Sequence, residues 1–209
     1  MEKLLYIEAS PRKERSHSIA VAEAFLAAYK TSHPEDTVEH LDLWHTQLPE
    51  FDDEVIDARY AILGQTPRTT LQNEAWKKIA IIFDHFQSAD KYIFAVPMWN
   101  FHIPYKLKHY IDVITQPSLA FEFVPGEGYK GLVTGKRAAV FYSRGGQYGP
   151  GSGAEAFDLQ KAYMELWLGF IGLTNLQTIV VEPTGGAPDD VAKIRTTALE
   201  QAAVLAAVF

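Results

Sequence analysis

The stretch Lys91–Phe101, KYIFAVPMWNF, decides the fold. Its first part, Lys91–Val96, is a mostly apolar run, which is typical of a strand buried on both faces of a parallel sheet. Pro104 then opens a helix, since proline is tolerated where the first N–H is not needed, and apolar residues repeat at helical spacing at Leu107, Tyr110, Ile111 and Ile114. Residues 97–101 therefore lie at the carboxyl end of a central strand, where open α/β sheets bind ligands.

The composition is that of an ordinary globular chain, with 209 residues, 47% hydrophobic and 22% charged. We expect one domain spanning residues 1–209. The net charge of -7 argues against nucleic acid or an anionic membrane as the main partner. The chain has no cysteine, which excludes disulfides, thiolate metal sites and a cysteine nucleophile.

Targeting and metal signals are also absent from the sequence. No run approaches the roughly 18 apolar residues of a membrane span, and the start of the chain lacks a signal-peptide pattern. The expected location is cytoplasmic. The histidines show no metal-binding spacing, so no metal site is expected.

Strand and helix patterns alternate along the whole chain. Strands are predicted at residues 4–9, 37–42, 91–96, 137–142 and 177–181. Helices are predicted after 18, over 71–87, after 104, over 157–172 and from 188 to the end, with a possible short helix over 52–63 and a loop or hairpin over 121–135. This order predicts an α/β fold with a five-stranded parallel sheet, strand order 2-1-3-4-5, and helices on both faces.

Three loops of this fold carry residues suited to chemistry. They are Ser10–Ser18, Pro97–Phe101 and Ser143–Gly146, and they follow the first, third and fourth strands. In a sheet of order 2-1-3-4-5 these loops lie side by side at the switch point. Their convergence is the main reason to expect a ligand site there.

The first loop resembles an anion-binding cradle, because it leads into a helix N-terminus. Ser10, Ser16 and Ser18 supply hydroxyl donors for a phosphate, and His17 stands at the helix start. The alternative is that Ser16 or Ser18 merely caps the helix. The basic side chains of the same loop are expected to be solvated, namely Arg12, Lys13 and Arg15.

The second and third loops suit the edge and face of a flavin ring. Backbone N–H groups after Pro97 and the Asn100 amide match ring nitrogens and carbonyls, and Met98 and Trp99 cover a face. The Ser143-Arg144-Gly145-Gly146 turn brings bare backbone close to a planar ligand. The alternatives are that Met98, Trp99 and Phe101 belong to the core and that the glycines form a flexible turn.

Taken together, these motifs resemble the FMN-dependent NADH azoreductases, a group of flavodoxin-like quinone and azo-compound oxidoreductases. The resemblance rests on four motifs: Ser10-Pro-Arg with Ser16-His-Ser18; Pro97-Met-Trp-Asn-Phe101 with Ile103-Pro104 and Leu107-Lys108; Ser143-Arg-Gly-Gly146; and Leu168-Gly-Phe-Ile-Gly172. They follow the family's order and spacing over nearly the whole chain.

The resemblance implies a flavodoxin-like fold that binds FMN tightly but non-covalently, with NADH or NADPH as co-substrate. It places the phosphate at Ser10, Ser16, His17 and Ser18. It places the isoalloxazine ring at Pro97, Met98, Trp99, Asn100, Phe101, Ser143, Arg144, Gly145 and Gly146. It further implies a homodimer whose pocket for a quinone or azo acceptor is lined by Phe121 and Trp167. No side chain is assigned a catalytic role, because the flavin carries the hydride.

The sequence departs from the family at His17, where glutamine is usual, at Trp99, where tyrosine is usual, and at His102, where glycine is common. The first change makes phosphate binding pH-dependent, and the other two bear on acceptor preference. Two alternatives stay open: a flavodoxin-type electron carrier and a flavin-binding regulator that does not oxidise NADH. FAD is a lesser possibility as the cofactor.

Overall fold

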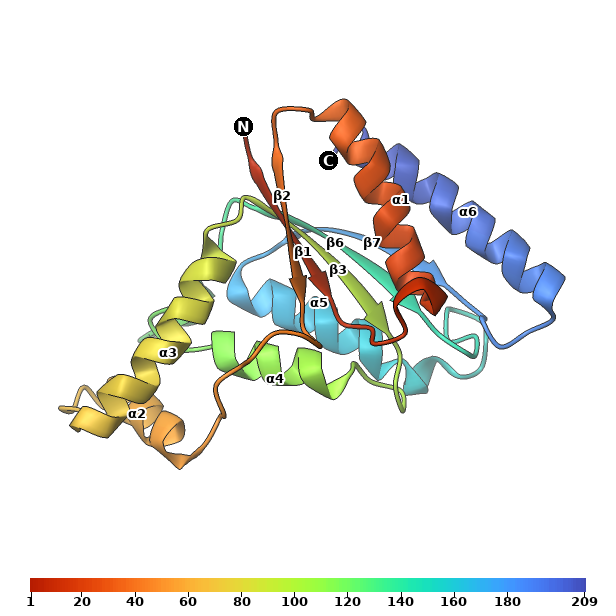
Figure 1. Cartoon of the computed structure of the whole chain (residues 1–209). Coiled ribbons are helices and arrows are strands. Elements are labelled where there is room, and N and C mark those ends of the chain that lie inside the picture. Colours follow the sequence, from red (N-terminus) through yellow and green to blue (C-terminus); the bar gives the residue numbers. More distant parts are fainter.

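The structure is a computed structural model that describes residues 1–209, and it has three layers (Figure 1). The central sheet contains five parallel strands in the order β2-β1-β3-β6-β7. They are β1 (Lys3–Glu8), β2 (Thr37–Asp42), β3 (Lys91–Pro97), β6 (Arg137–Ser143) and β7 (Asn175–Val181). In chain order of the parallel strands this is 2-1-3-4-5, so the predicted topology is confirmed.

Helices cover both faces of the sheet. Figure 1 shows α1 (His17–Ser32) and α6 (Pro188–Ala206) on one face. The other face carries α3 (Thr70–Gln87), α4 (Tyr105–Ile114) and α5 (Leu159–Ile171), and α2 (Asp53–Leu63) packs on α3. The predicted short helix over 52–63 is thus α2. A single 3₁₀ turn precedes α1 at Lys13–Arg15, and another precedes α5 at Glu155–Phe157.

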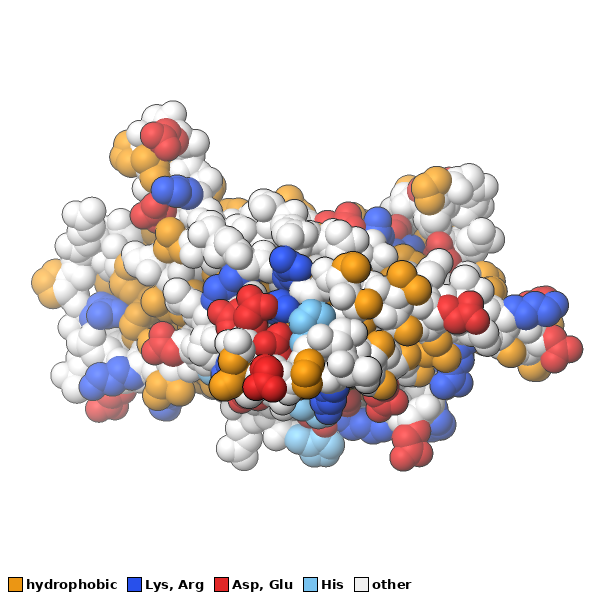
Figure 2. Space-filling model, turned by 90° about the horizontal axis from the view of Figure 1, so that it is seen from above, with side chains coloured by type: hydrophobic (Ala, Val, Ile, Leu, Met, Phe, Trp, Pro, Cys, Tyr) orange, Lys and Arg blue, Asp and Glu red, His pale blue; other side chains and the backbone are white.

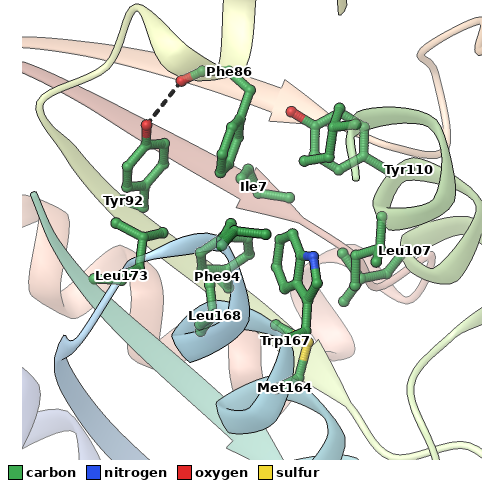
Figure 3. Close-up of a cluster of buried hydrophobic side chains, with 14 of the residues drawn as sticks. Ile7, Phe86, Tyr92, Phe94, Leu107, Tyr110, Met164, Trp167, Leu168 and Leu173 are labelled. Carbon is green, nitrogen blue, oxygen red and sulfur yellow. Dashed lines mark hydrogen bonds between the residues drawn. The ribbon is translucent and has the colours of Figure 1, made fainter. Parts of the chain in front are cut away.

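Alternate side chains of each strand feed two separate cores. Leu4 and Tyr6 of β1 pack with α1 and α6, whereas Leu5 and Ile7 pack with α3, α4 and α5. The second core is rich in aromatic rings (Figure 3): Phe86 stacks on Tyr92 at 4.6 Å, and the Tyr92 hydroxyl donates to the Phe86 carbonyl at 3.0 Å. Each such buried side chain contributes about 1.5–3 kcal/mol of hydrophobic stabilisation.

The excursion after α4 is a hairpin, as the sequence allowed. Its strands, β4 (Phe121–Val124) and β5 (Gly128–Gly131), are antiparallel. The hairpin lies against the end of α5 at Gly131, where a Cβ atom would stand 2.3 Å from the Gly172 backbone nitrogen. Gly172 itself closes α5 with a left-handed φ of 107°. Only glycine fits at both positions.

Helix boundaries differ from the prediction by a few residues. The helix predicted from residue 157 begins at Leu159, because the Asp158 carboxylate caps it by accepting from the Lys161 N–H at 3.0 Å. Pro104 stands at the N-cap of α4 and not inside it. Pro188 is the first residue of α6, and Asp189 follows in its first turn, where the helix dipole favours a negative charge.

The edge where the strands begin carries paired charges. Figure 2 looks onto this edge and shows acidic, basic and histidine side chains gathered near its centre. Lys91 is buried there between Glu2 at 2.6 Å and Asp36 at 3.5 Å, and Lys3 pairs with Glu39 at 2.6 Å. These pairs fasten the amino ends of β1, β2 and β3, at the opposite end of the sheet from the three loops of interest. No helix of the chain is long and apolar enough to cross a membrane.

Candidate functional site

Strand register brings the three loops together at the carboxyl edge of the sheet. Glu8 pairs with Ala95, and Pro97 pairs with Ser143. The Ala9 N–H donates to the Ala95 carbonyl at 3.1 Å, so the first loop leaves the sheet beside the second. The Met98 N–H donates to the Ser143 carbonyl at 2.8 Å, which joins the second loop to the third.

The first loop gathers its serines at the start of α1. Ser10, Ser16 and Ser18 are buried, and the Ser16 and Ser18 hydroxyls lie 3.1 Å apart. Ser16 is the N-cap of α1, because its hydroxyl accepts from the Ile19 N–H at 3.5 Å. Ser16 therefore caps the helix, as one alternative held, but at 3.5 Å this hydrogen bond is weak. The clustered hydroxyls and the helix N-terminus form the kind of cradle that holds a phosphate.

His17 is the first residue of α1 and is half-buried, and its Nδ1 has no hydrogen-bond partner in the chain. Burial lowers the pKa of His17 below its ordinary value, and the positive charges of Arg195 and Arg12 lower it further. His17 is therefore neutral at pH 7 in the protein without an anion. A phosphate beside the ring would favour its protonated form.

Lys13 differs from the prediction that the basic residues of this loop are solvated. Arg12 and Arg15 are exposed, but Lys13 bridges the carboxylates of the buried Glu8 and the partly buried Asp42. Its φ of 50° is unusual for a residue with a side chain. The sequence offered no sign of this, because the bridge needs β1 and β2 to end side by side.

Two histidines contact the carboxylates of this cluster. His40 Nε2 lies 3.1 Å from Glu8, and His45 Nδ1 lies 2.6 Å from Asp42. Burial acts to raise the pKa of Glu8, but hydrogen bonds from His40 and Lys13 outweigh it and lower the pKa. The same balance lowers the pKa of Asp42 to about 2. Both carboxylates are ionised at neutral pH and fix the first loop to the sheet.

The second loop is a strained turn. The Trp99 N–H donates to the His102 carbonyl at 2.8 Å, and the His102 N–H donates back at 2.9 Å. Asn100 and Phe101 between them have φ angles of 47° and 70°, as a type I′ turn requires. Asparagine tolerates this conformation, but phenylalanine does not favour it. Such strain is typical of functional sites, and here it leaves Asn100 and the Phe101 ring exposed.

The third loop presents bare backbone. Gly145 is exposed, and a Cβ atom built on it would meet nothing within 4 Å. The chain after β7 supports this loop, since the Gly185 N–H donates to the Gly145 carbonyl at 3.0 Å. Ser143 is the last residue of β6 and is buried. The open side of Gly145 is where a planar ligand can approach the backbone.

The side chain of Arg144 is directed away from this open side. It is 2% exposed, and its guanidinium is held by Asp158, Gln160 and Glu182. Any contact of Arg144 with a ligand at the loop is thus a backbone contact.

Phe121 and Trp167, the two residues expected to line an acceptor pocket, lie in the second core with 3% and 5% exposure. Trp167 Nε1 donates to the Thr115 hydroxyl at 2.9 Å, and its ring lies edge-on to Phe94. Phe121 contacts the Tyr129 and Phe170 rings. Within one chain neither ring is open to a ligand, and their role in a pocket stays a prediction.

The structure adds aromatic residues that the sequence analysis did not single out. The Trp44 ring, after β2, lies 5.7 Å from Trp99 and 5.5 Å from Tyr105. Tyr148, after the third loop, lies 6.3 Å from Phe101. Topology is the signal for Trp44, because the loop after every parallel strand begins at the same edge of the sheet and Trp44 follows the second strand. Tyr148 lies directly after the third loop.

Cavities flank the three loops. One of about 630 Å³ lies between α1 and α6 and is lined by His17, Thr184 and Arg195. Another of about 460 Å³ lies beside the second loop, with His102 and Tyr105 in its wall. Burial and the nearby Lys108 lower the pKa of His102, so the His102 side chain in this cavity wall is neutral near pH 7.

A doubly wound parallel sheet with a serine-rich cradle at the start of α1 and two backbone-rich loops beside it defines a flavodoxin-like protein. The family model described as Flavodoxin-like fold matches residues 2–205. The chain belongs to this family and, within it, to the FMN-dependent NADH:quinone oxidoreductases. The resemblance inferred from the four sequence motifs is thereby confirmed.

Two relatives and two solved structures show the extent of the similarity. The FMN-dependent NADH:quinone oxidoreductase of Desulfotalea psychrophila is 52% identical over 88% of this chain and 86% of its own. That of Nitratidesulfovibrio vulgaris is 46% identical over the full length of both chains. An azoreductase of Bacillus anthracis superposes with a TM-score of 0.90 at 35% identity, with both chains fully covered. An FMN-dependent NADH-azoreductase of Bacillus anthracis in complex with FMN superposes with a TM-score of 0.84 at 28% identity, covering 99% and 100%.

Proposed function

We propose that the protein is an FMN-dependent oxidoreductase that transfers two electrons from NADH or NADPH to quinones and azo compounds. The observation that carries the proposal is the junction of the three loops, where Met98 and Ser143 share a hydrogen bond beside the serine cradle of α1. Relatives that are 46–52% identical to it over the aligned residues are named FMN-dependent NADH:quinone oxidoreductases, and a structural neighbour is named an azoreductase. The chemistry that FMN supplies when bound is hydride acceptance and two-electron donation, in a ping-pong sequence.

The residues present fit both the phosphate end and the ring end of FMN. The phosphate would bind Ser10, Ser16, His17 and Ser18. The imidazole Nδ1 there has no hydrogen-bond partner, and the three serines are buried, so these groups could donate to an anion. Several hydrogen bonds to a charged phosphate, at about 1.5–3 kcal/mol each, are enough to hold it despite the net charge of -7. A terminal phosphate in this cradle suits FMN better than FAD.

The ring would lie against the second and third loops. Pro97, Met98, Trp99, Asn100 and Phe101 would meet one edge, and Ser143, Arg144, Gly145 and Gly146 the other. Backbone N–H groups near Asn100 and Gly145 would stabilise the negative charge of the reduced ring, as the donors of an oxyanion hole do. The Asn100 side chain is exposed and could itself reach the ring edge. No side chain is needed as a general base.

We further propose that two copies of the chain form a homodimer that completes the acceptor pocket. Exposed apolar side chains gather on α5 and the segments beside it: Phe101, Phe157, Leu159 and Leu166, with Phe123 and Tyr129 on the hairpin. Phe101 lies 5.2 Å from Phe157, and Phe123 lies 5.3 Å from Tyr129. Exposed apolar side chains that cluster in this way favour an interaction surface. A cytoplasmic location and a single functional domain spanning residues 1–209 stay predictions.

An electron carrier of the flavodoxin type is the second candidate, because it shares the fold and an acidic charge. The elements beyond the minimal five-strand fold, α2 and the β4–β5 hairpin, favour the enzyme, since a carrier needs no acceptor pocket. Anaerobic mixing of the FMN-loaded protein with NADH distinguishes the two. Bleaching of the flavin within a turnover time supports the enzyme, and an unchanged flavin spectrum would leave the carrier. A purified protein that is colourless and does not bind added FMN would overturn both.

A further inference from the structure

We propose that Arg144 is a positioning residue that sets the spacing between the second and third loops, and so between the two sets of backbone groups that would hold the flavin ring. This inference rests on the proposed function. It assigns to the guanidinium a task that its neighbours in the loop do not share, because Gly145 and Gly146 have no side chain with which to fix themselves.

The Arg144 guanidinium is buried and held by several partners. Arg144 is among the largest fully buried side chains of the molecule. Its Nη1 lies 2.8 Å from Asp158 and 3.3 Å from Glu182, and its Nε donates to the Gln160 side chain at 3.1 Å. The guanidinium is thus bound on separate sides by the start of α5 and the end of β7. A planar fork held at several points has one orientation.

Gln160 connects Arg144 to the second loop. Gln160, which accepts from Arg144, donates through Nε2 to the Val96 carbonyl at 2.9 Å. Gln160 is fully buried, and Val96 directly precedes Pro97. A continuous chain of hydrogen bonds therefore runs from Arg144 in the third loop to Val96 near the end of β3, just before the second loop.

Glu182 and Thr184 connect the third loop to the segment after β7. Glu182 accepts from Arg144 and also from the Tyr148 N–H at 2.9 Å. The Arg144 carbonyl accepts from the Thr184 N–H at 2.8 Å. Both ends of the turn that contains Gly145 and Gly146 are thus fixed, one through the guanidinium and one through backbone. The turn itself stays open toward a ligand.

Stability alone does not explain the burial of Arg144. Burying an arginine costs free energy that its ion pairs only partly return, and an apolar replacement is often as stable. Here the Nη2 atom is buried without a partner, so the network does not satisfy the guanidinium completely. A stabilising role alone is a weak reason for such a group. The continuous connection between two ligand-facing loops is a stronger one.

The test cuts the connection without removing the charge. Gln160→Met keeps the size of the side chain and removes both the bond to Arg144 and the bond to Val96. Arg144→Lys keeps the charge and loses the planar fork. Asp158→Asn keeps the cap of α5 and removes one charge from the ion pair. Asp190→Asn, an exposed carboxylate on α6, is the matched control.

We expect the FMN dissociation constant to rise about tenfold in Gln160→Met and in Arg144→Lys, which corresponds to about 1.4 kcal/mol. The visible circular dichroism of the bound flavin should change, and the rate of flavin reduction by NADH should fall more than the KM for NADH rises. The double variant Arg144→Lys/Gln160→Met should bind FMN no more weakly than whichever single variant binds it less tightly. The reason is that both changes break the same connection, the hydrogen bond between Arg144 and Gln160.

Two outcomes separate this inference from the proposed function. Wild-type protein that does not bind FMN refutes the proposed function. Wild-type protein that binds FMN while Gln160→Met and Asp158→Asn bind it within twofold, with unchanged dichroism, refutes the positioning role. If Arg144→Lys does not fold, Gln160→Met and Asp158→Asn decide the question alone, since each leaves the arginine in place.

Discussion

The indole Nε1 of Trp44 donates a hydrogen bond to the carbonyl of Ala9 at 3.0 Å. Ala9 is the residue at which the chain leaves β1 for the serine cradle, and the Trp44 ring contacts Trp99 in the second loop. One side chain from the segment after β2 thus touches both loops that would bind FMN, one near the phosphate and one near the ring. The proposed site would then include a residue outside the three loops predicted from the sequence.

The first prediction concerns this contact. Trp44→Phe keeps an aromatic ring beside Trp99 but leaves the Ala9 carbonyl without its donor, which costs about 1 kcal/mol. We expect FMN to bind several-fold more weakly, as measured by quenching of its fluorescence on titration. Trp76→Phe on α3 is the control and should leave FMN affinity unchanged. Equal affinities of the two variants would show that Trp44 only packs.

The second prediction concerns the open side of the third loop. Gly145→Ala adds one methyl group where nothing lies within 4 Å and where φ is not positive, so the free protein should unfold at an unchanged temperature. Its FMN affinity should fall by at least about tenfold, because a methyl group occupies space that the ring needs. Isothermal titration with FMN measures this. Normal affinity would place the ring elsewhere.

The sequence was informative where a pattern is local. The apolar run at Lys91–Val96 and the helical spacing after Pro104 predicted β3 and α4, and the alternation of elements predicted the order of the parallel strands. The three loops could be placed side by side from that order alone. These are properties of short stretches and of chain connectivity.

Side-chain contacts between distant segments could not be predicted in this way. The bridge from Lys13 to Glu8 and Asp42, the burial of Arg144 between α5 and β7, and the contact of Trp44 with Ala9 each depend on strand register and on rotamers. A tryptophan or a lysine in a loop looks the same in the sequence whether it is solvated or buried. Only the packed structure distinguishes the two.

The third prediction concerns acid stability. The pKa of Asp42 is lowered to about 2, so its ionised form stabilises the fold above the ordinary pKa of an aspartate, and this stabilisation is lost as the pH falls toward 2. Asp42→Asn should lower the free energy of unfolding at pH 7 by about 1–2 kcal/mol, since the side chain is largely buried. The difference from wild type should shrink between pH 4 and pH 2.

Urea unfolding at a series of pH values between 7 and 2 measures this difference. The control is Asp57→Asn on α2, an exposed carboxylate that should change stability little at any pH. A constant difference between Asp42→Asn and wild type over the whole range would contradict the ionic role of Asp42.

The fourth prediction separates strain from contact at Phe101, whose φ is 70°. Phe101→Asn and Phe101→Ala both remove the ring, but asparagine tolerates the left-handed conformation better than alanine. We expect the asparagine variant to be more stable than the alanine variant by about 0.5–1 kcal/mol in chemical unfolding. Both should lose FMN affinity to a similar extent. Equal stabilities would mean that the turn relaxes when the ring is removed.

The last prediction concerns the apolar surface of α5. Leu159 and Leu166 stand seven residues apart, so they share one face of the helix, and both are more than half exposed. A second copy of the chain would remove them from water, and each fully covered leucine contributes about 1.5–3 kcal/mol to association. Leu159→Lys/Leu166→Lys should therefore convert a dimer to a monomer in analytical ultracentrifugation.

Val204→Lys on α6 is the control, since Val204 is as exposed as Leu166 but lies on the opposite face of the sheet from α5. It should leave the dimer intact. The monomeric double variant should still bind FMN through its own three loops, while its rate with quinone and azo acceptors should fall, because the partner would no longer enclose the acceptor. A monomeric wild type, or a double variant with full acceptor turnover, would contradict a pocket shared between two copies.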